Sequence, residues 1–569
     1  MRLSPRQMTR GRVPPLADFL LFGVVASLTA GPPLVVIATQ LRTADGQGWS
    51  LRQGLGAMLH LLTSAEFLHA LLTTLTLGCV VTAFCLPIGV GLALLVGRTD
   101  IAGSKRWDGL ITLPLSTSPF TLLVAWIALA SPRTGFLNMA RSAVAGGAFD
   151  IWSLSGLAFV LILALSPVVY LFTADALRGI GGAAEEAARM SGASPLYVLR
   201  HITLKLCAGM IAASGLLVFL LTIEFYTMPG LIGDEAGFTT LPWLAVQNAT
   251  SAPPHPAQAA SCAIILLGIS ALVCALQQRA LRLARSHALP HSADTEAQRL
   301  KLGRLRPLAQ AGLGGFVLLA CLLPFLALLL SSLLRQSSVH LSISLLTAGH
   351  YLSLLTTPAM RAALLHTVLL AVITGLACAG LGLLIAQIEQ RAARLTRLIA
   401  IMALLPLAIP GLVIGLGLQR AASETAWQGS LAVLAIAMIA RFLPFGVLAG
   451  RFGLARLHPS HAEAARLSGA SALTTLRLIH APLLARSLTA GLLLVMLNTL
   501  RELAAAPLLA GPDSQTLAML VWHHMQIGDE QFAGSLAVVQ TGMMISIVLL
   551  ARALARIRLD RRFGVGERG

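Results

Sequence analysis

Residues 186–194 read Glu186-Ala187-Ala188-Arg189-Met190-Ser191-Gly192-Ala193-Ser194, and residues 463–471 repeat them as Glu463-Ala464-Ala465-Arg466-Leu467-Ser468-Gly469-Ala470-Ser471. The two copies, called the EAA words below, differ only where Met190 is replaced by Leu467. Both copies lie in polar gaps between long apolar runs. Two such words in register indicate an internal duplication, in which each half exposes the same loop on the same side of a membrane.

The apolar runs identify a polytopic membrane protein. The chain has 569 residues, of which 56% are hydrophobic and only 11% are charged, and its mean hydropathy is +0.81. A membrane-spanning helix needs roughly 20 apolar residues, and strand-like alternation is absent, so we expect an all-α protein with about twelve spans. The expected spans are 17–41, 70–96, 110–130, 153–174, 206–228 and 258–277, then 309–333, 362–386, 398–419, 430–450, 487–509 and 535–551.

The distribution of basic residues predicts the orientation. The net charge is +18, which in a soluble protein would suggest nucleic acid as a partner. Roughly three quarters of the Lys and Arg residues, however, fall in alternate gaps between the apolar runs, as the positive-inside rule predicts. We therefore expect both termini and both EAA words to lie in the cytoplasm, and we do not expect nucleic acid to bind.

The duplication predicts two halves of the same orientation. We expect a first half over 1–277, a polar linker over 278–307 and a second half over 308–569, with the EAA loops at about 178–205 and 451–486. Short echoes extend the repeat: Ala70-Leu71-Leu72-Thr73-Thr74 resembles Ala363-Leu364-Leu365-His366-Thr367, and Leu113-Pro114-Leu115 resembles Leu405-Pro406-Leu407. With six helices in each half, the two halves form a parallel repeat.

The EAA words resemble the EAA loop of ABC-importer permeases, Glu-Ala-Ala-x3-Gly-x9-Ile-x-Leu-Pro. Departures from this pattern are Lys205 in the first copy and Ala481 in the second. The residues themselves predict a helix that Gly192 or Gly469 breaks and that restarts, in the first copy, after Ser194-Pro195. The resemblance implies that each loop docks on an ATPase subunit through Glu186, Ala187, Ala188 and Gly192, and through Glu463, Ala464, Ala465 and Gly469.

We do not expect this chain to be an enzyme. It lacks a phosphate-binding loop of the Gly-x4-Gly-Lys-Ser/Thr type, so separate partner subunits, two copies by our expectation, would hydrolyse ATP. The seven cysteines have no metal-ligand spacing, and we expect no cofactor. We also do not expect a metal site at His523-His524-Met525, because neighbouring residues on a helix point about 100° apart.

Two acids lie at membrane depth near the outer ends of the fifth and eleventh spans, Glu224 and Glu502. Such acids are costly and usually face a cavity or a partner. They could line a translocation path, where carboxylates would suit a hard cation. Alternatively, they pair with a membrane-embedded arginine, either Arg441 or Arg501.

Longer stretches resemble the fused permeases of the ferric-iron importer family: Glu224-Phe225-Tyr226-Thr227-Met228-Pro229-Gly230, Arg501-Glu502-Leu503 and Gly97-Arg98-Thr99-Asp100. The resemblance implies a bacterial inner-membrane permease for ferric iron, served by a periplasmic binding protein. Thiamine, aminoethylphosphonate and polyamines are alternative cargoes in the same class of importer. A secondary transporter driven by an ion gradient also fits the helix number, but it would have no use for paired ATPase-docking loops.

Overall fold

A computed structural model of the chain describes residues 16–42, 48–132, 134–142, 149–180, 183–286, 299–336, 343–391, 393–457, 467, 474, 478 and 481–563. Within these residues the regular structure is helical, apart from three isolated β-bridges. Nine of the described helices are long and apolar enough to cross a membrane, or up to twelve spans if each of three bent helix pairs counts as one. The all-α fold expected from the sequence is confirmed.

The first half of the described chain contains α1 (Leu16–Thr29), α2 (Gly31–Leu41), α3 (Leu51–Thr63), α4 (Ala65–Arg98), α5 (Ser104–Thr112), η2 (Leu113–Ser116), α6 (Pro119–Ala130), α7 (Phe136–Ser142), α8 (Leu154–Gly179), α9 (Ala183–Met190), α10 (Pro195–Val198), η3 (Leu199–Thr203), α11 (Leu204–Glu224), α12 (Thr227–Ala236), α13 (Leu241–Thr250) and α14 (Pro256–Ser286).

The second half contains η4 (Gly303–Leu305), α15 (Arg306–Val317), η5 (Leu318–Leu322), α16 (Leu323–Ser332), η6 (Ile343–Leu345), α17 (Gly349–Thr356), α18 (Pro358–Glu389), α19 (Arg394–Met402), η7 (Leu405–Leu407), α20 (Gly411–Ala422), α21 (Leu431–Leu454), α24 (Ala481–Leu500), α25 (Ala506–Leu509), η9 (Pro512–Ser514), α26 (Leu517–Gln526) and α27 (Glu530–Phe563).

Three of the expected spans are bent rather than straight. Helices α1 and α2 meet at 55°, the α5–η2 segment meets α6 at 93°, and the α19–η7 segment meets α20 at 105°. Prolines lie at each of the two sharp bends, Pro114 and Pro119 in the first half and Pro406 and Pro410 in the second. Proline cannot donate a backbone hydrogen bond and clashes with the preceding turn, which ends the helix there.

The eleventh expected span is also shorter than predicted, because α24 ends at Leu500 rather than near residue 509. Just beyond this end, one carboxylate oxygen of Glu502 accepts hydrogen bonds from the backbone N–H groups of Ala504 (2.7 Å) and Ala505 (2.9 Å). A side chain that captures these donors satisfies the backbone of a turn, so the chain can leave the helix at membrane depth.

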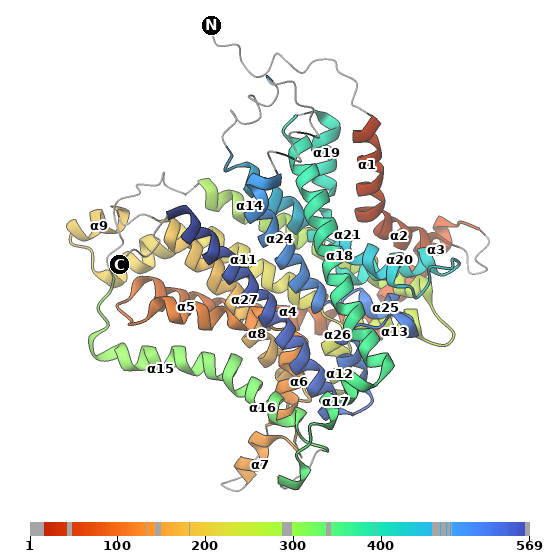
Figure 1. Cartoon of the computed structure of the whole chain (residues 1–569), viewed down its shortest axis with the longest axis horizontal. Helices are drawn as coiled ribbons and strands as arrows, with labels where there is room; N and C mark the ends of the chain where they lie inside the picture. Colours follow the sequence, from red (N-terminus) through yellow and green to blue (C-terminus); the bar gives the residue numbers. More distant parts are fainter. Residues whose placement is uncertain are drawn as a thin grey trace.

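The two halves pack by the same plan and exchange their first helices (Figure 1). Helix α4 packs on α8 and α11 in the first half, just as α18 packs on α21 and α24 in the second. The opening helices cross to the other half: α1 and α2 pack against α19 and α20, while α15 and α16 pack against α5 and α6. The halves are therefore interlocked, with one buried apolar cluster running through both.

A pair of equivalent hydrogen bonds fixes the register of the repeat. The hydroxyl of Thr74 accepts the backbone N–H of Leu241 at 2.8 Å, and the hydroxyl of Thr367 accepts that of Leu517 at 2.8 Å. Both threonines also donate to the carbonyl four residues earlier, at 2.7 Å in each case. The two threonines occupy the same place in the echoed sequences, so the short echoes mark true structural counterparts.

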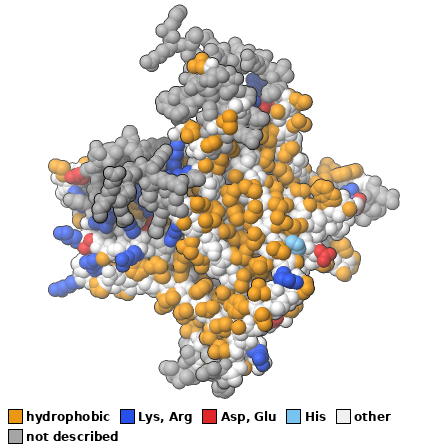
Figure 2. Space-filling view, viewed as in Figure 1, with side chains coloured by type: hydrophobic (Ala, Val, Ile, Leu, Met, Phe, Trp, Pro, Cys, Tyr) orange, Lys and Arg blue, Asp and Glu red, His pale blue; other side chains and the backbone are white. Residues whose placement is uncertain are grey.

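The surface has the polarity of a membrane protein. Figure 2 shows apolar side chains over the middle of the molecule, with Lys and Arg gathered mainly toward the edge where α5 and α9 lie. Large apolar side chains on the outer faces of α4 and α18 are exposed, such as Leu72 at 63% and Leu365 at 67%. Apolar exposure on this scale requires a lipid environment.

Candidate coupling loop and central ion cluster

The first EAA word folds as a short helix, a turn and a second helix start. Helix α9 ends at Met190, and Gly192 follows with a φ of +85°, a conformation that favours glycine. Ser194 caps α10 by accepting the backbone N–H of Tyr197 at 3.3 Å, with Pro195 in the first turn. The predicted helix–turn–helix of the first copy is confirmed.

The expected docking residues of this loop lie at the surface. Glu186, Ala187 and Gly192 are exposed and Ala188 is half-buried, and α9 projects at the edge of the bundle (Figure 1). Glu463, Ala464, Ala465 and Gly469 lie outside the described residues. The first loop thus presents an exposed acid on a short helix, which is a geometry that can enter a groove on another protein.

The neighbouring acid, Glu185, joins this loop to α4 and to Thr203, and the sequence alone did not single it out. Its side chain is buried, with a residue exposure of 4%. One carboxylate oxygen lies 3.3 Å from Nη2 of Arg98 at the end of α4, and it accepts the hydroxyl of Thr203 at 2.8 Å. The available signal was a difference between the repeats, because Ala462 stands before the second EAA word where Glu185 stands before the first.

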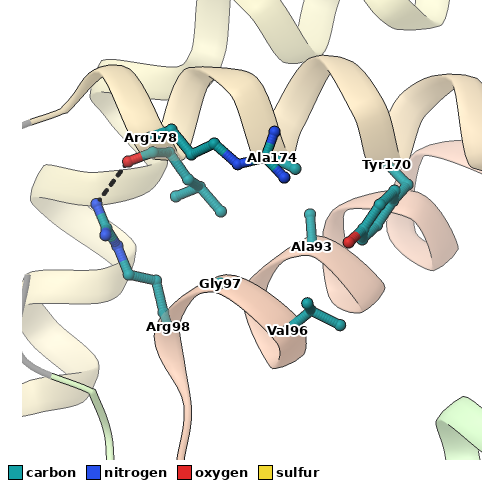
Figure 3. A pocket seen from close by; sticks show the side chains of 8 residues that line it. Ala93, Val96, Gly97, Arg98, Tyr170, Ala174 and Arg178 are labelled. Atoms are coloured by element: carbon teal, nitrogen blue, oxygen red, sulfur yellow. Dashed lines mark hydrogen bonds between the residues drawn. The ribbon is translucent and has the colours of Figure 1, made fainter. Parts of the chain in front are cut away.

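Arg98 is held from several sides. Its Nη2 donates to the carbonyl of Leu177 at 3.0 Å, drawn as a dashed line in Figure 3. A small cavity of about 70 Å³ lies between the ends of α4 and α8, with Tyr170 and Arg178 on its α8 side. The Tyr170 hydroxyl donates to Asp108 at 2.6 Å, and Arg178 pairs with the same carboxylate at 3.3 Å. The ends of α4, α5 and α8 are thereby joined beside the first EAA loop.

A second group of charges lies at the far end of α11, between the two halves. Nη2 of Arg441, from α21 of the second half, is 3.3 Å from Glu224, which ends α11 of the first half. Nε of the same arginine is 3.1 Å from Glu502. Of the two arginines that the sequence offered as partners, the structure shows both acids paired with Arg441. We call Glu224, Arg441 and Glu502 the central ion cluster.

Arg501 makes a different contact across the halves. Its Nη1 donates to the backbone carbonyls of Leu115 at 3.1 Å and Thr117 at 3.3 Å, both in the bend between α5 and α6. Its Nη2 donates to the side chain of Asn498 at 2.8 Å. The two arginines therefore differ in their partners. Arg441 balances the charge of two carboxylates, and Arg501 donates to the carbonyls that the proline break leaves without helix partners.

The central ion cluster keeps unused hydrogen-bonding capacity. Among the described atoms, Nη1 of Arg441 and the hydroxyl of Tyr226 are buried without a hydrogen-bond partner. The guanidinium has room because Gly411 lies against it, and a Cβ at this position would overlap Nη1. An arginine with a free donor, flanked by two carboxylates, can contact both charged ends of a zwitterion.

The histidine pair near the end of the chain shows no metal geometry. Nδ1 of His524 lies 3.2 Å from a carboxylate oxygen of Asp529. Within the described part of the chain, no three His, Cys, Asp or Glu side chains gather as metal ligands would.

Comparisons with known proteins agree with the duplicated architecture. The family model of the binding-protein-dependent transport system inner membrane component matches residues 62–286 and again residues 378–565. A Salmonella choleraesuis protein named as a 2-aminoethylphosphonate transport system permease, PhnU, is 27% identical over 232 residues, which are 40% of this chain and 78% of that protein. The sn-glycerol-3-phosphate transport system permease UgpA of Yersinia pseudotuberculosis is 27% identical over 189 residues, which are 32% of this chain and 63% of that protein.

These relatives are named for a phosphonate and a phosphate ester rather than for ferric iron, so the comparisons do not specifically support ferric iron as the cargo. The expected class of protein is supported, since the matched family consists of membrane components of transport systems. The chain belongs to the family of binding-protein-dependent transport system inner membrane components, and it carries two copies of the family's domain.

Proposed function

We propose that this chain is the complete membrane pore of an ATP-driven bacterial importer, with its two halves fused through the linker at 278–307. Its basic gaps support a topology in which both termini and both EAA loops face the cytoplasm. Many importers assemble this pore from two subunits, whereas here residues 1–277 and 308–569 would serve as the two. The interlocked opening helices support this reading, because each half completes the packing of the other.

Two ATPase subunits would dock on the two EAA loops, and a binding protein would deliver the cargo on the opposite side. The exposed Glu186 on α9 supports docking of the first subunit. Apolar side chains close by support it too, since Met190 is 86% exposed and Leu196 is 73% exposed. Glu463 and Gly469 would serve the second subunit. ATP hydrolysis would then occur in the partners, and this chain would convert their closure into alternating access.

We propose a small phosphonate or phosphate monoester, with 2-aminoethylphosphonate first, as the cargo. The names of the relatives carry this proposal. The central ion cluster supports it, because the argument for a cation depended on free carboxylates at Glu224 and Glu502. Both acids are paired with Arg441, so the site offers a guanidinium as well as carboxylates. Arginine binds phosphonate and phosphate oxygens well, and the acids could hold the ammonium group.

The central ion cluster would lie on the translocation path. It stands where α11 of one half meets α21 of the other, and a path between two related halves must pass through their interface. A moving zwitterion would offer its anionic group to the guanidinium and its ammonium group to the two carboxylates, so that the buried charges keep partners during passage.

Uptake by cells tests the cargo. Cells with and without this chain would be given labelled 2-aminoethylphosphonate, glycerol 3-phosphate, ferric iron, thiamine and a polyamine in parallel. We expect selective loss of 2-aminoethylphosphonate uptake in the cells that lack the chain. Loss of iron uptake alone would contradict the phosphonate proposal. Uptake that persists with a collapsed ion gradient and stops on ATP depletion would exclude a secondary transporter.

A further inference from the structure

The contacts around Glu185 form a compact clasp, defined here as Arg98, Glu185 and Thr203. Its members come from the end of α4, the first turn of α9 and the last residue before α11. Their residue exposures are 8%, 4% and 1%. A buried carboxylate is stable only when it is paired and hydrogen-bonded, and this one has a guanidinium at 3.3 Å and a hydroxyl at 2.8 Å.

The clasp also meets the chain segment that joins the two halves. The backbone N–H of Leu300 donates to the carbonyl of Arg98 at 2.8 Å, and the N–H of Asp100 donates to the carbonyl of Leu300 at 3.1 Å. The side chain of Asp100 then accepts the N–H of Leu302 at 3.0 Å. Arg98, which contacts the EAA loop through Glu185, is thus itself held by residues of the linker.

Helix α4 can carry a movement of the clasp across the molecule. A 34-residue helix is about 50 Å long. Thr74, near its other end, accepts the backbone N–H of Leu241 on α13. A helix transmits a displacement better than a loop does, because its backbone hydrogen bonds restrain the dihedral angles between the two ties. Pro87 removes one of these hydrogen bonds within α4.

The second half is built differently at the same place. Its arginine in the register of Arg98 is Arg391, which is 3.2 Å from Asp18 on α1 of the first half. Ala462 stands where the first half has Glu185, and His480 stands where it has Thr203. The position before the second EAA word therefore lacks the carboxylate that a clasp of this kind needs.

From these contacts we propose that Glu185 is a positioning residue, which couples the first EAA loop rigidly to α4 and α11, and that the second loop lacks this coupling. The proposal depends on the proposed docking of an ATPase on the loop. It makes the two loops unequal: movement of the first would be passed to its own half through a buried ion pair, while Arg391 would tie the second half to α1.

The test uses the full chain reconstituted with its ATPase subunits and binding protein. The first variant is Glu185→Gln, which removes the charge at nearly constant size. The second is Thr203→Val, a milder change that still tests the clasp if Glu185→Gln does not fold. Arg391→Gln is the matched control in the second half. The measurements are ATPase retention, cargo transported per ATP hydrolysed, and hydrogen exchange of the peptide 183–203.

We expect Glu185→Gln to keep the ATPase bound while transport per ATP falls about fivefold or more. Exchange of the peptide 183–203 should speed up about tenfold, which corresponds to 1.4 kcal/mol of local stability. Thr203→Val should lower transport per ATP and speed up exchange of the peptide by smaller factors. Arg391→Gln should leave the exchange rate of this peptide unchanged.

Wild-type transport per ATP in both clasp variants would overturn the proposal, even if exchange became faster, because the clasp would then be structural only. The proposed function fails separately, if the wild-type chain retains no ATPase. In that event the exchange measurement would still decide whether the clasp holds the loop.

Discussion

The two halves share one scaffold of apolar helices but use their buried charges differently. At the end of the second long helix, Arg98 binds its own half through Glu185, whereas Arg391 binds the opposite half through Asp18. At the centre, the second half supplies Arg441 from α21, and Ala164 is its counterpart in register on α8. The two halves thus share the packing of their helices, while their buried ion pairs are specific to each half.

The largest effect should follow from removing the central charge. In Arg441→Leu, two buried carboxylates from different halves lose their shared cation, and breaking a buried pair in this way costs about 3–5 kcal/mol. We expect loss of uptake and a large drop in the thermal stability of the purified protein. Arg420→Leu is the control, because Arg420 pairs with the exposed Glu424 and donates to the hydroxyl of the nearby Ser423, so its replacement should change little. Wild-type uptake in Arg441→Leu would contradict the role of the cluster.

A smaller loss should come from crowding the same arginine. In Gly411→Ala the new Cβ would overlap Nη1 of Arg441, so the guanidinium must move away from one of its acids. Overpacking of this kind costs about 1–3 kcal/mol, and uptake should fall with stability. Gly312→Ala is the matched control, because its Cβ would meet nothing within 4 Å. Equal behaviour of the two variants in a thermal unfolding assay would show that the close approach at Gly411 is unimportant.

The comparison of Arg98 with Arg391 predicts an unequal pair of effects. The Arg98 side chain is 9% exposed and the Arg391 side chain is 43% exposed. Only the Arg391 end of the second pair is open to solvent, since the Asp18 side chain is 7% exposed. Arg391→Gln should therefore cost less than Arg98→Gln, in which both ends of the pair are buried. Denaturation midpoints of the two variants measure this directly. A larger loss for Arg391→Gln would reverse our ranking of the two halves.

The smallest predicted effect concerns pH. In the repeat register His524 on α26 corresponds to Asn248 on α13. Burial lowers the pKa of His524 from its usual 6.5, more than the nearby Asp529 carboxylate raises it. The unfolded chain therefore binds this proton more readily, and stability falls as the pH drops below about 6.5.

The variant His524→Asn should remove this dependence and make the second half resemble the first. Unfolding temperatures of the wild type and the variant at about pH 7.5 and about pH 5.5 measure it. An identical loss of stability in both proteins would assign the pH dependence to other groups.

The sequence predicted the helical framework well, because membrane spans depend on composition along a single segment. It did not predict that the third and ninth spans bend, although Pro114 and Pro406 were visible, because proline allows either a kink or a break. The tertiary structure was needed to choose between Arg441 and Arg501 as the partner of the acids. Arg501 instead donates hydrogen bonds to backbone carbonyls more than 380 residues earlier in the chain.

Glu185 is a second residue whose partner could not be identified from the local sequence. Its partner Arg98 lies on a different helix, and nothing local distinguishes it from the adjacent Glu186. Only the contrast between two nearly identical repeats, with Ala462 at the matching place, singles it out. A difference between duplicated segments is therefore a useful signal for a residue with a task in one half alone.

The proposed importer requires that both EAA words dock ATPase subunits. The measurement is the amount of ATPase subunit, recognised by its phosphate-binding loop, that co-purifies with the wild-type chain, with Glu186→Arg, with Glu463→Arg and with the double variant. We predict that each single variant loses part of the ATPase and that the double variant retains less than about a tenth, since charge reversal at an interface costs several kcal/mol. Wild-type amounts of ATPase on the folded double variant would contradict the claim.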